Sequence, residues 1–218
     1  MDSQVKVKPE LKIIREEKIP HLLVPGEMGA VLELLVKDKD GKVTDHRVMR
    51  SKSFVRQFLE LLWIQAFQIA SIAPYSVRDT GNTLQAICQG AYTFACNALA
   101  DDETLGIIVG VGTTAPDIDD YKIETIINTG GVGGQLNYGG VTYGAPASDA
   151  TTSQFTITRD FSNASGAEIT VNEIALYVKA HKYDTDYYFM IIRDVIGGGV
   201  AVPNGQTLTV NYREQAVI

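Results

Sequence analysis

Hydrophobic and polar residues alternate in short runs through the second half of the chain, and Gly, Asn, Asp and Pro separate the runs. Alternation with a period of two predicts strands with one face in a core, and regular turn signals between them are typical of an antiparallel β-sandwich. We therefore predict a mainly β chain with a jelly-roll-like sandwich. Its predicted strands are Gly106–Val111, Leu136–Tyr143, Gln154–Phe161, Glu168–Val178, Tyr187–Val195 and Gln206–Ala216.

The fourth run changes phase along its length. Its hydrophobic positions pass from Ile169 and Val171 to Ile174, which would move them from one face of a strand to the other. One extra residue restores the phase, so we predict a β-bulge near Asn172 and Glu173.

A helical period replaces the strand period in Phe54–Ala73. Apolar residues recur there at spacings of three and four, which predicts one long α-helix of about five turns, embedded in the sandwich. Ser51 and Ser53 are its candidate N-caps, and Pro74 stops it.

The apolar positions of this helix cover two of its sides, because a second set lies opposite the main stripe, namely Val55, Leu59, Trp63 and Phe67. A helix that covers one sheet needs a single stripe, so the pattern implies burial on both sides. We expect this helix to take part in an interface with other proteins. The interface residues that we predict are Phe54, Phe58, Leu61 and Trp63.

The first 50 residues have a different character. Pro9, Pro20 and Pro25 punctuate the beginning of the chain, which predicts an extended N-terminal arm. A β-hairpin is expected next, from Gly29–Val36 to Lys42–Met49, because turn residues separate these two β-prone runs. We divide the chain into residues 1–50, with the arm and hairpin, and residues 51–218, with the helix and sandwich.

The charge of the chain argues against general nucleic-acid binding. The net charge is −7, and the sequence pI is about 5.0. Residues 1–56 carry 12 basic and 9 acidic side chains, whereas the remainder carries 7 and 17. An acidic sandwich joined to a mildly basic arm favours contacts between unlike surfaces of neighbouring subunits.

No membrane span or secretory signal is expected. Arg56, Glu60, Gln65 and Gln68 interrupt the most apolar stretch, and the N-terminus lacks a continuous apolar region. Synthesis in a cytoplasm follows, and there Cys88 and Cys96 should be reduced and packed.

Candidate catalytic and metal-binding motifs are weak. Gly106–Thr114 is a strand that leads into glycines, but it lacks the Lys of a phosphate-binding loop and opens no helix, so a buried strand with a tight exit is the better interpretation. The acidic run Asp117–Glu124 does not have the spacing of an EF-hand, and we favour a solvated loop over a structural Ca²⁺ site, which stays open. His21, His46 and His181 are scattered along the chain. We therefore predict no enzyme activity and no cofactor.

Arg159, Glu173 and Arg193 stand inside apolar strands, where an unpaired charge is costly. One hypothesis is a structural ion pair of Glu173 with Arg159 or Arg193. The alternative is that each side chain points to solvent from a sheet face.

Tyrosines gather in the same β-rich region, and aromatic side chains on β loops can stack on sugars. This gives an alternative function, a carbohydrate-binding module for attachment to a host glycan. Its stacking residues would be Tyr138, Tyr143, Tyr183, Tyr187 and Tyr188.

Five segments resemble virion structural proteins of tailed bacteriophages and related prokaryotic viruses, of the tail, collar, fibre-attachment or capsid-associated type. They are SKSFVRQFLELLW (Ser51–Trp63), GIIVGVGTTAPDIDDYKIE (Gly106–Glu124), FTITRDFSNASGAEITVNEIALYV (Phe155–Val178), FMIIRDVI (Phe189–Ile196) and VPNGQTLTVNYRE (Val202–Glu214).

The resemblance implies a location in the virion and a role in assembly. Such proteins hold their neighbours through large interfaces, arms and added strands. We expect a homo-oligomer that binds other virion proteins through residues 1–50, the helix and the sandwich surfaces.

Overall fold

The computed structural model describes residues 22–51, 54–69, 74–88, 94–182 and 185–218. Most of the predicted arm, Ser53 and the end of the predicted helix lie outside these residues. The described chain contains twelve strands and one helix, α1. Their bounds are β1 Met28–Lys37, β2 Val43–Arg50, α1 Arg56–Ala66, β3 Tyr75–Arg78, β4 Leu84–Ile87, β5 Gly106–Gly110, β6 Asn137–Tyr138, β7 Thr142–Tyr143, β8 Ala147–Ser148, β9 Thr152–Ser162, β10 Ile169–Lys182, β11 Thr185–Val202 and β12 Thr207–Val217.

The chain is mainly β and its sheets are antiparallel, as the alternating pattern predicted. The larger sheet has the order β2-β1-β12-β9-β6, and β7 and β8 also pair with β9. The predicted hairpin forms β1 and β2, and its turn places Gly41 at φ 78°. β1 also pairs with β12 from Met28↔Ala216 to Lys37↔Thr207, so the sequence division at residue 50 falls inside one sheet.

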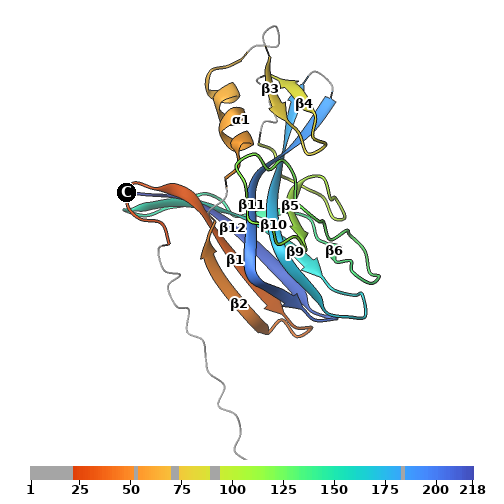
Figure 1. Ribbon diagram of the computed structural model, residues 1–218. Helices are drawn as coiled ribbons and strands as arrows, with labels where there is room; N and C mark the ends of the chain where they lie inside the picture. The colour runs from red at the N-terminus through yellow and green to blue at the C-terminus, as the bar shows by residue number, and fades with distance from the viewer. Residues whose placement is uncertain (1–21, 52–53, 70–73, 89–93, 183–184) are drawn as a thin grey trace, which may run out of the picture.

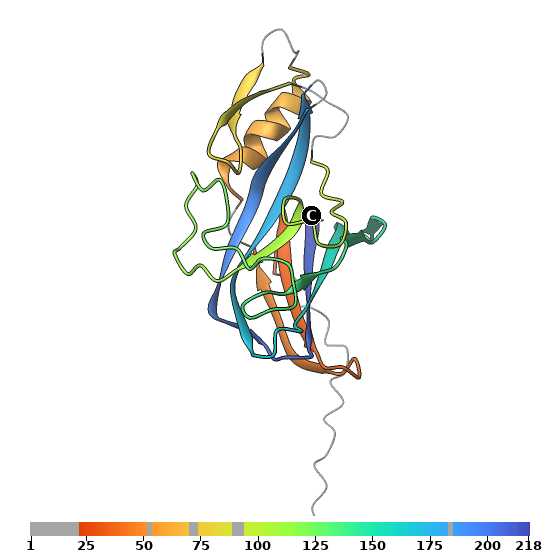
Figure 2. The same cartoon turned by 90° about the vertical axis from the view of Figure 1, so that its right-hand side faces the viewer.

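The second sheet has three strands in the order β11-β10-β5. A separate two-stranded sheet, β3-β4, lies beside α1 at one end of the molecule, near the ends of β10 and β11 (Figures 1 and 2). The start of α1 is joined to β11, because the amide of Val55 donates to the carbonyl of Ile191 at 3.1 Å.

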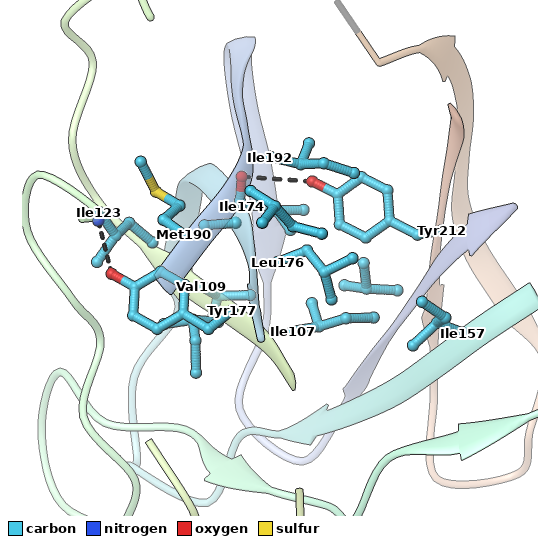
Figure 3. Packing of buried hydrophobic residues seen from close by; sticks show 14 of the residues in the cluster. Ile107, Val109, Ile123, Ile157, Ile174, Leu176, Tyr177, Met190, Ile192 and Tyr212 are labelled. Carbon is cyan, nitrogen blue, oxygen red and sulfur yellow. Dashed lines mark hydrogen bonds between the residues drawn. The ribbon is translucent and has the colours of Figure 1, made fainter. Parts of the chain in front are cut away.

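One hydrophobic core joins the two larger sheets (Figure 3). Leu32 and Val210 enter it from the larger sheet, and Ile174 and Ile192 enter it from the smaller one, all with 0% exposure. Tyr212 crosses between the sheets, and its hydroxyl donates to the carbonyl of Ile174 at 3.4 Å. Side chains of both sheets therefore share one core.

The bulge predicted near Asn172 and Glu173 is present in β10. Its pairing with β11 shifts register between Val171 and Glu173. A second shift, between Leu176 and Tyr177, has no counterpart in the sequence prediction.

The predicted five-turn helix is wrong in its length and in its N-caps. α1 begins at Arg56 after Val55, which makes no side-chain capping bond, and Phe67 is its C-cap. The physical reason for the end is Gln68, whose φ of 51° leaves the helical region. Among the described residues, no helix combines the length and hydrophobicity that a membrane crossing requires.

Candidate functional site

The charged residues of the strands form a buried cluster around Arg193. Its Nε lies 3.0 Å from Glu173 Oε2, across the β10-β11 pair. Its two terminal nitrogens reach Asp120 Oδ2 at 2.8 Å and Glu124 Oε2 at 3.4 Å, and Nη2 also donates to the carbonyl of Thr114. Of the two arginines considered as partners of Glu173, Arg193 is the one that forms the ion pair.

The same carboxylate holds the loop that follows β5. Glu173 is 0% exposed, and it accepts hydrogen bonds from the amides of Gly112, Glu124 and Thr125 at 2.8 to 3.1 Å. A Cβ on Gly112 would collide with Glu173. The absence of a side chain at Gly112 therefore leaves room for the Glu173 carboxylate. The glycines at the exit of β5 allow this close packing.

Arg159 is also 0% exposed, but it does not join this cluster. No ion pair to it occurs among the described residues, so the proposed pairing of Arg159 with Glu173 is wrong. Carbonyl oxygens satisfy the guanidinium instead, and the ring of Tyr138 lies 4.7 Å from its central carbon. The five accepting carbonyls belong to Leu99, Asp102, Leu105, Ile107 and Gly139, at 2.7 to 3.1 Å.

The acidic run at 117–124 is tied to arginines. Asp120 and Glu124 contact Arg193, and Asp119 pairs with Arg56 at the start of α1. Within the described ranges, no group of three or more His, Cys, Asp or Glu side chains could hold a metal ion. The arrangement fastens a loop to both the smaller sheet and α1.

The tyrosines proposed to bind a glycan do not all face solvent. Tyr138 is 2% exposed, and its hydroxyl donates to the carbonyl of Ile127 at 2.7 Å, so it cannot stack on a sugar. Tyr143 is exposed, Tyr187 packs partly buried against the core, and Tyr183 lies outside the described residues.

An apolar groove of about 640 Å³ opens where α1 overhangs one end of the two larger sheets. The larger sheet contributes the ends of β1, β9 and β12, and the smaller sheet contributes β10 and β11. Its main apolar walls are Met28, Phe54, Phe58, Phe155, Leu176 and Ile191.

One carboxylic acid, Glu214, lines this groove. On β12 it follows Leu208, Val210 and Tyr212 on the inward face, with Phe155 as its cross-strand neighbour. No hydrogen bond or ion pair reaches its carboxyl group from any residue that the structure describes. Burial, with a smaller contribution from Asp194, raises its pKa to about 7.

Cys96 lies in the same groove as a free thiol. Burial, and then the nearby charge of Glu214, raise the pKa of the Cys96 thiol to about 11. Such a thiol stays protonated at neutral pH and is a poor nucleophile. Cys88 is also free, and its burial agrees with the packed position expected from the sequence.

Beside the groove lies the outer face of α1, which we define as Leu59, Leu62, Trp63 and Phe67 together with Tyr75 of β3. These side chains are 40 to 69% exposed. Leu59 and Leu62 belong both to the groove and to the hollow between α1 and β3. The ring of Trp63 packs against those of Phe67 and Tyr75, with centroids 5.8 and 5.1 Å apart.

The predicted interface residues fall into three groups. Leu61 is 0% exposed and is therefore an internal core residue, which corrects its assignment to an interface. Phe54 and Phe58 are partly buried at the groove, whereas Trp63 is 42% exposed on the outer face. Burial of α1 on two sides does not occur within the described chain, because Leu59 and Phe67 stay exposed.

Comparison with known protein families, with curated proteins and with solved structures finds no match to this chain.

Proposed function

We propose that this chain is a structural component of a virus particle, without catalytic activity. It self-associates and binds neighbouring capsid or tail proteins through its N-terminal residues, its sheet surfaces and α1. The observation that carries the proposal is the outer face of α1, because it presents a continuous apolar surface to solvent.

The energetics favour an interface at this face. Large exposed apolar patches are rare on monomers and mark sites of protein contact. Aromatic side chains such as Trp63 and Phe67 are enriched in the buried centres of interfaces. The resemblance of Ser51–Trp63 and four later segments to virion structural proteins supports the same role.

The proposal also covers the arrangement of the two larger sheets and the role of the N-terminal residues. We infer that the two facing sheets are a jelly-roll-like β-sandwich and that the residues before Leu22 act as an extended arm. In an assembly built from repeated subunits, an arm adds contact area to a neighbour without enlarging the sandwich itself.

The test of this role is the location of the chain in lysates in which it is naturally produced. We expect it to co-sediment with virus particles through a density gradient, and immunogold electron microscopy should place it at regular positions on them. A chain that stays apart from every particle fraction contradicts the proposal.

The outer face can be tested with a matched pair of variants. The double variant L59Q/F67Q changes two side chains that are 65 and 69% exposed, so it should keep the melting temperature and lose particle association. The control V132Q alters a loop side chain that is 64% exposed, and it should keep both. Equal incorporation of the two variants would exclude the outer face as the contact.

A further inference from the structure

Glu214 gives the apolar groove a chemical preference. Its carboxyl group lies among apolar walls and has no cationic or hydrogen-bonding partner among the described residues. The acidic side chain of Asp194 and the hydroxyl of Tyr212 are its electrostatic neighbours, and neither supplies a positive charge. An occupant that buries apolar side chains and brings one cation would satisfy this site.

The shape of the surface favours a polypeptide occupant. Pockets for small ligands have volumes of roughly 300–1,000 Å³, which the groove alone would fit. The groove, however, shares Leu59 and Leu62 with the neighbouring hollow on the outer face of α1, so the two apolar surfaces adjoin. An extended segment can follow such a surface, whereas a small molecule would leave most of it exposed.

One segment of this chain carries the matching pattern, Leu11-Lys12-Ile13-Ile14-Arg15. In an extended conformation, side chains two residues apart share a face. Leu11, Ile13 and Arg15 would then lie together, with two apolar side chains followed by a guanidinium. Lys12 would point the other way.

A second copy is the better source of this segment than the same chain. Leu23 packs with Val31 and Val217 on the face of the larger sheet that points away from the core. Glu214 and Ala216 line the groove on the opposite face. The described chain therefore begins on the side of the sheet that faces away from its own groove.

We propose that the groove binds Leu11–Arg15 of a second copy of this chain, with Arg15 paired to Glu214. The inference rests on the proposed function, since it specifies how one subunit holds the next. The arm of each copy fills the groove of its neighbour, and the pair can repeat around a closed assembly.

A charge exchange on the full-length chain tests the pairing. Sedimentation velocity measures self-association of the wild type, R15E and E214R. Each single variant should weaken association about tenfold or more, because it places like charges together in the groove. An equimolar mixture of the two variants should return to within about threefold of the wild type, since the arm of R15E matches the groove of E214R.

Two further variants keep the test decisive. K12E makes the same charge change as R15E on the opposite side of the segment, and it should associate like the wild type. If E214R does not fold, E214Q removes the charge without adding one, and it should weaken association by about threefold.

The outcomes separate this inference from the proposed function. Wild-type self-association that is unaffected by R15E and E214R overturns the groove assignment and leaves the role in assembly intact. If the mixture of R15E and E214R does not regain self-association, the pairing of Arg15 of one copy with Glu214 of another is overturned. Native mass spectrometry that finds a co-purified small molecule in the groove also overturns it. A wild-type chain that never self-associates counts against both proposals.

Discussion

Glu173 and Arg193 show how much the type and position of a single residue reveal about its surroundings. Their positions inside apolar strands predicted that each needs a partner, because an unpaired buried charge is costly. The sequence did not distinguish Arg159 from Arg193 as the partner of Glu173. Register across β10 and β11 decides it, and carbonyl oxygens of a distant loop satisfy Arg159.

We predict that E173Q destabilises the fold by about 3 kcal/mol, because it removes the charge of the fully buried carboxylate that faces Arg193. Chemical denaturation measures the change in the free energy of unfolding. The control E168Q makes the same substitution at an exposed position just before β10, and it should stay within about 0.5 kcal/mol of the wild type. Equal stability of the two variants would mean that the Glu173 ion pair contributes nothing.

Glu214 makes stability depend on pH. Its pKa is raised from 4.5 to about 7 in the folded chain, so folding favours the protonated carboxyl. The stabilisation is complete below about pH 4.5 and is lost as the pH rises through about 7. Because the side chain is partly exposed, we expect a loss of about 1–2 kcal/mol.

The measurement is the melting temperature of the wild type and E214Q from pH 5 to pH 8, at a concentration where the chain is monomeric. The wild type should lose more stability than E214Q over this range, because the Gln side chain does not ionise. Cys96, Asp194 and Tyr212, which face Glu214, are the same in both proteins. Parallel pH curves would show that Glu214 titrates normally.

At the scale of elements, alternation was informative only where one face of a strand is less buried than the other. The phase change between Val171 and Ile174 revealed the first bulge of β10. The second shift falls in Ala175–Val178, where every residue is buried, so the sequence has no phase to change. The end of α1 was missed for a similar reason, because apolar residues continue past Gln68.

Three consecutive glycines in β11 give a sharp test of local backbone geometry. Gly199 has φ 59°, and a Cβ there would lie 2.5 Å from Thr170 Cγ2 and would also meet Asn172. We predict that G199A destabilises the fold by about 2 kcal/mol or more. G197A should be nearly neutral, because its Cβ would meet no atom within 4 Å. Thermal denaturation compares the two, and equal melting temperatures would contradict the requirement for glycine at position 199.

At the scale of the whole molecule, the candidate site depends on tertiary structure. Phe58, Phe155, Leu176 and Glu214 come from four elements far apart in the sequence, and they meet only because α1 overhangs one end of both sheets. The pattern did predict a helix with two apolar sides. It could not say which side the core would cover, since both carry residues of similar hydrophobicity.

The central claim is that this chain works through surfaces that join subunits. The most direct test is the native mass of the full-length chain over a wide concentration range, by sedimentation equilibrium. The account predicts multiples of 23.7 kDa that dissociate when L59Q/F67Q is introduced. A wild-type chain that remains at 23.7 kDa at every concentration would contradict it.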